Sequence, residues 1–471
     1  MSMHMASRAV VAASVVVGGC SSSLDPAFRT LPDASALETN EERSSSRSVF
    51  REDGSADAPT LTDGSSADDY VRYALFHSPA VEEAYQRWRV ASERIPQVSA
   101  LPDPRLSVGF FLDEVETRTG AQQARVGVSQ SFPWPGLLQG REDVEILAAR
   151  AAWSRFDAAR LEVTARVVTA LHELAYLDAS ARIAAENLDL LSSFEDVVRA
   201  RYRVGAGSHP ELVRVQVELG LLDDRLQQIR AMRPAMVASL NAALGRPTDA
   251  AIASVPELPG RLAVPAPAEL AEMAMRSNPS IRALAEQADA ERARTEVARR
   301  EGRPSFSVGL DYIVTDDAMD PSIPESGDDP IFLNLGLSLP VWRGKYEAGV
   351  RESIARRLAT THARSDAANG IAASIGQAWF EHTDADRRAR LYERTLIPKA
   401  EESLRASLAS FRAGETSFLD LLDTERTLLE FLLAIERAHA DRGQALARLQ
   451  SLVGEPIPTI DASTVIQEDR P

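Results

Sequence analysis

The sequence contains almost no cysteine, few aromatic residues and no long apolar run beyond its N-terminus. Cys20 is the single cysteine among 471 residues, which excludes an intrachain disulfide. Aromatic residues make up only 6% of the chain, and together with abundant Ala, Arg, Leu and Glu this favours long helices over a conventional mixed core. No later window approaches the roughly eighteen apolar residues of a transmembrane helix. A passage across a membrane would therefore have to use strands.

Positive charge is also scarce. The chain has 52 Lys and Arg against 69 Asp and Glu, a net charge of -17, whereas nucleic-acid binding requires a basic face. We therefore expect no nucleic-acid partner. Signals of catalysis are missing too, since His172-Glu173 lacks the second histidine of a metalloprotease helix and no glycine-rich phosphate loop follows a strand. The prediction is a protein that is not an enzyme and has no cofactor and no metal site.

The N-terminus has the pattern of a secretion signal. Arg8 supplies a positive charge, and Ala9 to Val17 form a short apolar segment that "GGC" follows. The residues "VGGC" resemble the lipobox of bacterial lipoproteins, in which the cysteine is acylated and becomes the first mature residue. We expect a signal peptide at 1–19, lipidation at Cys20, and a flexible anchored segment at 20–68, which is rich in Ser, Asp, Glu, Gly and Pro. The alternative is an incidental cysteine in a frayed terminus.

The remainder of the sequence is an internal duplication. Short segments recur in the same order, and the pairs are "HSPAVEEA" with "SNPSIRAL", "PRLSVGF" with "PSFSVGL", "SFPWPG" with "SLPVWRG", "YRVGAGSHPEL" with "FRAGETSFLDL", and "LNAALGRP" with "LQSLVGEP". These matches define structural repeat 1 at 69–250, structural repeat 2 at 267–456 and a C-terminal tail at 457–471.

Each repeat is predicted to contain the same elements. A helix leads to a hairpin of two alternating segments, a very long helix follows, and a glycine-containing turn connects it to a return helix. The expected ranges are 69–100 and 267–302 for the first helices, 114–123 and 315–330 for the polar hairpin loops, and 137–204 and 345–413 for the long helices. At about 1.5 Å per residue each long helix spans roughly 100 Å, a length for which a soluble domain has no use.

The hairpin segments alternate with a period of two. Phe306, Val308 and Leu310 fall on one face, and Ser307 and Gly309 fall on the other. A tilted strand of about nine to ten residues crosses a bilayer. The same alternation also suits a half-buried hairpin packed on the helices of a soluble protein. The secretion signal and the residues that flank the hairpins favour the membrane.

Tryptophan marks one end of each hairpin. Trp134 and Trp342 stand beside Pro133 and Pro340, where a strand would leave the bilayer. The indole ring is apolar but its N–H requires a polar partner, so tryptophan is favoured at a membrane interface. Proline lacks the ladder donor and ends a strand. We therefore predict Trp134 and Trp342 to be membrane-interface aromatics.

Over about residues 69–456 the chain resembles the TolC-like family of outer-membrane efflux proteins. The resemblance rests on the duplicated repeats, on "FPWPG" at the strand end, and on the Tyr/Phe-Arg-x-Gly tip turns with a following serine and an acidic residue next to leucine. It implies a mainly α fold with a membrane β-barrel portion, built as a homotrimer. Four strands per protomer would form a twelve-stranded β-barrel, continued by an α-helical barrel across the periplasm. "SFPWPG" and "LNAALGRP" are most similar to the CusC/CzcC-like lipoprotein branch, which serves heavy-metal cation efflux.

The resemblance also implies a partner for the two tip turns. They would contact the hairpins of a periplasmic adaptor (membrane fusion) protein, and the candidate residues are Gly205, Ser208, Gly414 and Ser417. Helix capping is the alternative interpretation. Glycine can end a helix in the left-handed conformation, and both serines have capping-box spacing to an acidic residue.

Two aspartates are candidates for a pore constriction. Asp420 and Asp423 in "FLDLLD" match the aspartates that line the periplasmic entrance in relatives. They share one helix face, and threefold symmetry would repeat that acidic face around the pore and concentrate cations there. The alternative is two solvated residues in a first helical turn. Repeat 1 has Glu211 and Arg214 at the corresponding positions, so the constriction would not be acidic in both repeats.

The predicted function is an outer-membrane channel, the exit duct of a tripartite efflux system. It would pass substrates from an inner-membrane pump, such as an RND transporter, through the adaptor to the outside. In the enterobacterial rule, an aspartate directly after the lipidated cysteine retains a lipoprotein in the inner membrane. Ser21 stands at this position instead, which favours an outer-membrane location with a lipid anchor and a long periplasmic extension. Heavy-metal cations are the predicted substrates, with drug or general solute export as the alternative. A lipid-anchored periplasmic coiled-coil scaffold or adaptor is the rival from another class.

Overall fold

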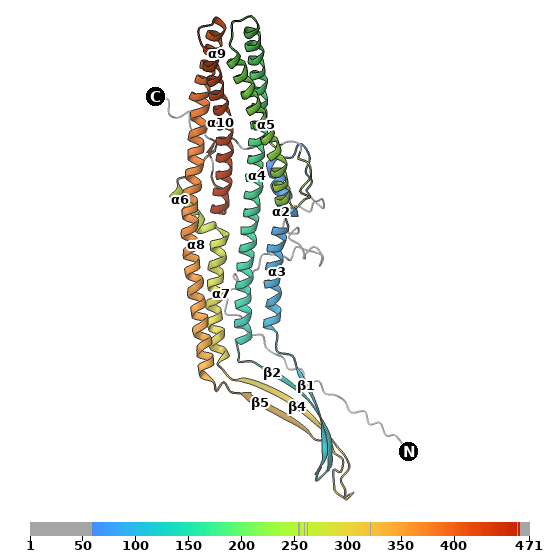
Figure 1. Cartoon of the computed structure of the whole chain (residues 1–471). Coiled ribbons are helices and arrows are strands. Elements are labelled where there is room, and N and C mark those ends of the chain that lie inside the picture. Colours follow the sequence, from blue (N-terminus) through green and yellow to red (C-terminus); the bar gives the residue numbers. More distant parts are fainter. Residues whose placement is uncertain are drawn as a thin grey trace, which may run out of the picture. The chain divides into compact units, whose positions relative to one another are not determined.

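The computed structural model describes residues 59–252, 255–258, 260, 262–320, 322–458 and 460–461 (Figure 1). These residues belong to two compact units. The strand unit contains residues 93–147 and 289–357, and the helical unit contains residues 59–92, 148–288 and 358–461. The predicted signal peptide and lipidation site lie outside the described residues.

The two halves of the chain have the same order of elements (Figure 1). In the first half these are α2 (Ala67–His77), α3 (Pro79–Ser99), β1 (Arg105–Thr117), β2 (Gly120–Phe132), α4 (Leu137–Arg203) and α5 (His209–Leu244). In the second half they are α6 (Pro267–Ser277), α7 (Pro279–Glu301), β4 (Ser305–Thr315), β5 (Ile331–Ser338), α8 (Arg343–Leu391), the π-helical turn η4 (Tyr392–Leu396), α9 (Ile397–Ala413) and α10 (Phe418–Val453). The short strands β3 (Leu262–Ala263) and β6 (Ile460–Asp461) pair separately.

The prediction of a single helix before each hairpin was wrong, because each is divided into two. Ser78 and Asn278 have extended backbone, with ψ angles of 124° and 119°. Each precedes a proline, whose ring disfavours the helical conformation of the residue before it. Asn278 then caps α7, since its Oδ1 accepts hydrogen bonds from the backbone N–H of Ser280 at 2.9 Å and of Ile281 at 3.1 Å.

The strands of the first hairpin are longer than predicted. The prediction of a polar loop at 114–123 was therefore wrong. β1 continues to Thr117 and β2 begins at Gly120, so that only two residues form the turn. Gly120 has a φ of 133°, which favours glycine. The pairing of β1 with β2 shifts between Phe110 and Val115, and this bulge interrupts the period-two pattern that sequence reasoning relies on.

The first long helix is confirmed, since α4 runs without interruption from Leu137 to Arg203. The second, predicted at 345–413, begins at Arg343 and is interrupted by the π-helical turn Tyr392–Leu396. Pro398 lies just after this turn, and its ring cannot coexist with a regular hydrogen bond to the carbonyl of Arg394. The wider π-helical turn accommodates the proline without ending the helical path.

The hairpins of the two halves form one antiparallel sheet with the order β1-β2-β4-β5. β2 and β4 are the central pair, with Val128 opposite Leu310 and Ser131 opposite Ser307. One face of the sheet is apolar and exposed, with Leu106, Val108, Phe110, Val126, Val128, Phe306, Val308, Leu310, Leu333, Leu335 and Leu337. The alternation expected for repeat 2 is therefore confirmed.

The opposite face of the sheet carries many small residues, which lie close to polar side chains of the neighbouring strands. A Cβ atom at Gly127 would lie 2.1 Å from Oδ1 of Asp311, and one at Gly336 would lie 2.2 Å from Oγ of Ser307. Glycine allows these two polar side chains to lie over the neighbouring strand, and an alanine at either position would force the Asp311 or Ser307 side chain to shift.

The helical unit is held together by apolar clusters formed within a single chain. One joins α2, α3, α4 and α5 around Tyr85, Trp88 and Phe156. A second joins α4, α5, α9 and α10 around Phe411 and Phe418. Among the described helices, none combines the length and the apolarity needed to span a membrane.

Candidate functional site

The two turns at the tips have the same construction. α4 ends before Gly205, whose φ of 71° is left-handed, and Ser208 begins α5 with a capping box to Glu211. The Ser208 backbone N–H donates to Oε2 of Glu211 at 3.0 Å, and the Glu211 N–H donates to Oγ of Ser208 at 3.4 Å. No side chain lies within 4 Å of a Cβ placed on Gly205.

The second tip follows the same plan with a shorter acidic residue. Gly414 has a φ of 80°, and Ser417 begins α10 with a capping box to Asp420. The Ser417 backbone N–H donates to Oδ2 of Asp420 at 3.2 Å. All four predicted tip residues therefore lie at helix ends, where capping determines their conformation, and Asp420 takes part in one of the caps.

Arg201 connects the two tips and was not singled out in the sequence. Its Nη1 donates to the backbone oxygen of Phe411 at 2.8 Å, and its guanidinium lies 4.5 Å from the centre of the Phe411 ring. Phe411 in turn contacts Phe418 at a ring distance of 5.7 Å. The end of α4 is thereby fixed to the end of α9.

Asp420 and Asp423 lie together beside a hollow of about 440 Å³ between α5 and α10. The surface of this hollow is mixed in charge, since Arg214, Glu218 and Arg426 also line it. The Asp423 carboxylate is exposed and faces away from the helical core. The predicted constriction residues therefore share one surface with two arginines.

An ion pair across this hollow was missed at the sequence level. Nε of Arg426 donates to Oε1 of Glu218 at 2.7 Å, and a second guanidinium nitrogen donates to the other carboxylate oxygen. Such a two-bond pair fixes both side chains more firmly than a single contact does. It connects α5 to α10 beside the two aspartates, and no local motif could have revealed it because the partners are 208 positions apart.

Glu425 is the most deeply buried carboxylate near this surface. Its side chain is only 2% exposed and accepts a hydrogen bond from Nδ2 of Asn187 on α4. Burial raises the pKa of Glu425 to about 7, and the hydrogen bond from Asn187 opposes that rise. The neighbouring Glu218 raises this pKa further, whereas Arg426 lowers it.

Two histidines are buried in the middle of the helical unit. Burial lowers the pKa of His172 to about 4, and the nearby Arg442 lowers it further. Its ring occupies a notch over Gly443, where a Cβ atom would lie 2.0 Å from the imidazole. Burial also lowers the pKa of His382, against an opposing effect of Asp386. Both are packed helical residues rather than members of a metal-binding motif.

The polar face of the sheet contains one ion pair. Nε of Arg125 on β2 donates to Oδ1 of Asp311 on β4 at 2.9 Å, and Asp311 is only 5% exposed. The Arg125 guanidinium also lies 4.8 Å from the centre of the Phe332 ring on β5. The pair joins the hairpins of the two halves through side chains as well as through the backbone.

The predicted interface tryptophans follow the strand ends. Trp134 comes two residues after β2, and its ring stacks with Phe306 of the apolar face at a centre distance of 6.3 Å. Trp342 lies between β5 and α8 and is 78% exposed. Trp134 therefore adjoins the apolar face, and both tryptophans follow the strand ends from which the chain continues into a helix.

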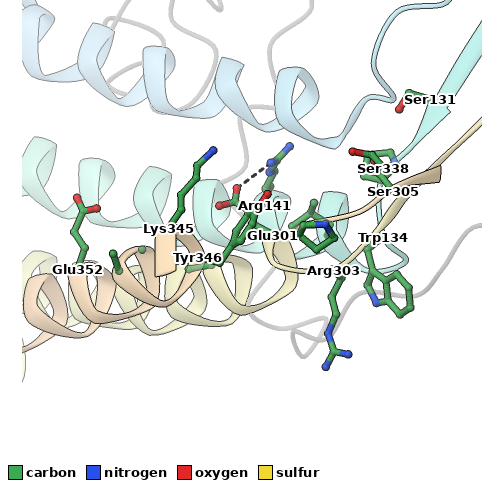
Figure 2. Close-up of a pocket in the computed structure, with 16 residues that line it drawn as sticks. Ser131, Trp134, Arg141, Glu301, Arg303, Ser305, Ser338, Lys345, Tyr346 and Glu352 are labelled. Carbon is green, nitrogen blue, oxygen red and sulfur yellow. Dashed lines mark hydrogen bonds and ion pairs between the residues drawn. The ribbon is translucent and has the colours of Figure 1, made fainter. Parts of the chain in front are cut away.

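The strand unit contains a hollow of about 880 Å³ where the sheet joins the helices (Figure 2). Ser131, Ser305 and Ser338 border it at the strand ends. Arg141 of α4 and Glu301 of α7 form an ion pair of 2.9 Å across it, which Figure 2 marks with a dashed line. Arg303, Lys345 and Glu352 also border the hollow.

Within the part of the chain that the structure describes, no group of three or more His, Cys, Asp or Glu side chains is arranged to hold a metal ion. The lipidation predicted at Cys20 falls outside that part.

Comparison with known sequences matches most of the chain. The family described as "Outer membrane efflux protein" matches residues 71–246 and 270–455. The cobalt-zinc-cadmium resistance protein CzcC of Cupriavidus metallidurans is 21% identical over 377 residues, which cover 76% of this chain and 83% of CzcC.

Solved structures show a similar fold. The outer membrane protein VceC from Vibrio cholerae has a TM-score of 0.69 and 18% identity, with 83% of this chain and 96% of VceC covered. CusC, whose structures concern folding and transmembrane channel formation, has a TM-score of 0.70 and 15% identity, with 86% of this chain and 96% of CusC covered. The duplicated order of helices and strands described above is thus the fold of these proteins.

Proposed function

The chain belongs to the outer membrane efflux protein family, and on this premise we propose that it is the outer-membrane exit duct of a tripartite efflux system. The four-stranded sheet is the observation that carries the proposal, because one face is apolar and exposed while the other carries mainly Ser, Gly and charged residues. An open sheet leaves edge groups without hydrogen bonds, which lipid does not tolerate. Three copies of the four strands would close a barrel of twelve and remove both edges.

The proposed substrates are heavy-metal cations. The similarity to CzcC, a cobalt-zinc-cadmium resistance protein, supports this choice because it extends over 83% of that protein. Proteins of this family are channels rather than enzymes. The protein would supply a water-filled path and would leave the selection of the metal to its partners.

Those partners are a periplasmic adaptor and an inner-membrane pump of the RND type. We assign the adaptor contact to the tips at Gly205, Ser208, Gly414 and Ser417, and a lipid anchor to Cys20. The open space around Gly205 and Gly414 supports an accessible surface at both tips. Asp420 and Asp423 would form the periplasmic constriction, since threefold symmetry would repeat their shared surface around the pore.

Channel formation can be tested on detergent-extracted protein. We expect a trimer by sedimentation and stepwise pores when it is added to a planar bilayer. The Cys20→Ala variant removes the acylation site and should still form trimers in the outer membrane through the strands. Recovery of this variant as a soluble periplasmic monomer would instead support the scaffold or adaptor interpretation.

The adaptor contact can be separated from helix capping by the choice of substitution. Ser208→Asp and Ser417→Asp retain an N-cap of similar strength, whereas the corresponding alanine variants lose about 1 kcal/mol at each cap. We expect the aspartate variants to assemble normally but to lose metal export and cross-linking to the adaptor. Full export by the aspartate variants, with a defect only in the alanine variants, would assign these serines to capping alone.

A further inference from the structure

A second hollow of the strand unit, of about 650 Å³, lies between the end of α7 and the start of α8. These helices are connected to β4 and β5, so the hollow adjoins the end of the sheet where the chain leaves it. Four arginines line it, with Glu347 as the one acidic residue among its lining side chains; the arginines are Arg299, Arg303, Arg343 and Arg351. This concentration of positive charge stands out in a chain with a net charge of -17.

Two of these arginines have no acidic partner. Among the described residues, no carboxylate lies within ion-pair distance of Arg303 or Arg343, whereas Arg299 pairs with Glu296 at 2.5 Å and Arg351 with Glu347 at 3.9 Å. α8 begins at Arg343, so the positive end of this helix adds to the charge of the hollow. The arrangement is complementary to an anion.

Arg303 connects the hollow with the apolar face of the sheet through Trp134. The Arg303 guanidinium lies 5.9 Å from the centre of the Trp134 ring, and Trp134 stacks with Phe306. Figure 2 shows Arg303 and Trp134 extending to the same side, away from the Arg141–Glu301 pair. A ligand held here would have its charge at the arginines and apolar surface beside it.

We propose that this hollow, named here the arginine hollow, binds the headgroup of an anionic phospholipid in the leaflet where the strands end. The inference rests on the proposed membrane function, because that function places the apolar face of the sheet in lipid. Guanidinium groups donate two parallel hydrogen bonds to a phosphate, and Arg303 and Arg343 are free to do so. Ala298, Pro304 and Val350 supply apolar contacts for the glycerol and the first acyl carbons.

A phospholipid would contact both the arginines and the adjacent apolar surface, whereas a soluble anion would contact only the arginines. Tryptophan and arginine side chains favour the boundary between the headgroups and the acyl chains, where the ring and the charge are both accommodated. The proposed occupant is therefore a lipid with a net negative headgroup, such as phosphatidylglycerol, in preference to one with no net charge.

Native mass spectrometry of the detergent-extracted trimer tests this assignment. The full-length protein is titrated with phosphatidylglycerol or with phosphatidylcholine, and bound lipid is counted. We expect the wild type to retain phosphatidylglycerol preferentially and the Arg303→Gln/Arg343→Gln variant to retain roughly tenfold less. Arg225→Gln/Arg364→Gln is the matched control, because it removes two exposed arginines elsewhere on helices of the chain.

The outcomes separate this inference from the channel proposal. If the trimer conducts in a planar bilayer but both double variants retain as much phosphatidylglycerol as the wild type, the arginine hollow is not a lipid site. Equal retention of the two lipids by the wild type would likewise refute selection by charge. Failure of the wild type to form trimers or pores would contradict the channel proposal itself.

Discussion

At the scale of single residues, Glu425 makes the stability of the helical unit depend on pH. Its pKa is raised from 4.5 to about 7. Between pH 4.5 and 7, Glu425 is therefore protonated in the folded state and ionised in the unfolded state. The contribution of the protonated Glu425 to the free energy of unfolding is complete below pH 4.5, and it is lost as the pH rises through 7. The ionised form destabilises the folded chain by roughly 3 kcal/mol relative to the neutral form.

We predict that Glu425→Gln removes this dependence. The amide keeps a hydrogen-bonding partner for Asn187 without a charge, so the variant should unfold at a higher temperature than the wild type at pH 8 and at a similar temperature at about pH 4, below both pKa values. Thermal unfolding followed by circular dichroism across this range measures the difference. Glu430→Gln, at an exposed position of α10, is the control and should behave as the wild type does. Parallel pH curves for wild type and Glu425→Gln would show that Glu425 is not the titrating group.

The notch at Gly443 supplies a prediction about packing. Gly443→Ala forces a Cβ atom into the His172 ring, and we expect a loss of about 1–3 kcal/mol of stability. His172→Ala in the same chain should restore most of that loss, because it vacates the notch. Gly376→Ala on α8 meets no atom within 4 Å and should stabilise the helix by about 0.5–1 kcal/mol. Denaturant unfolding of Gly443→Ala, His172→Ala, the double variant and Gly376→Ala tests this, and an additive double variant would argue against the contact.

At the scale of elements, the two faces of the sheet predict opposite tolerances. Val308 lies on the exposed apolar face, and Val308→Arg should cost about 2–4 kcal/mol on insertion into a bilayer. Ser307 lies on the other face, and Ser307→Ala is the matched control that should assemble normally. The amount of heat-labile trimer in the outer-membrane fraction reports the result. Normal trimer yield for Val308→Arg would mean that this face does not contact lipid.

The helices illustrate which elements can be read from sequence. Ser208 with Glu211 and Ser417 with Asp420 form the capping boxes that their spacing predicts, because a cap involves residues within one turn. The breaks at Ser78 and Asn278 also have a local cause in the proline that follows, but the apolar periodicity continues across them and concealed them.

At the scale of the whole molecule, the constriction proposal predicts a change in ion permeation. The Asp420→Asn/Asp423→Asn variant keeps polar side chains in the Ser417 cap but removes two negative charges from the surface of each protomer. We expect higher conductance or weaker block by divalent cations in planar bilayers. Asp223→Asn/Asp224→Asn, which removes two exposed aspartates from α5, should leave both properties unchanged. Unchanged conductance and block in the first variant would remove these aspartates from the constriction.

Local patterns in the sequence predict the duplicated order of elements, the two-faced strands, the long helices and the tip turns. Each of these depends on residues close together in the chain, where period, proline and capping spacing act directly. The sequence did not reveal the bulge between Phe110 and Val115, because the strand partner decides where pairing shifts.

Which charged groups are buried and which are paired depends on the packing of distant segments. Glu425 meets Asn187 238 positions away, Arg426 meets Glu218 208 positions away, and α7 and α8 together surround the arginine hollow. In the sequence these residues stand among many similar charges on helices, and nothing local distinguishes them. Burial and pairing arise from packing between distant segments, and that packing is a property of the fold as a whole.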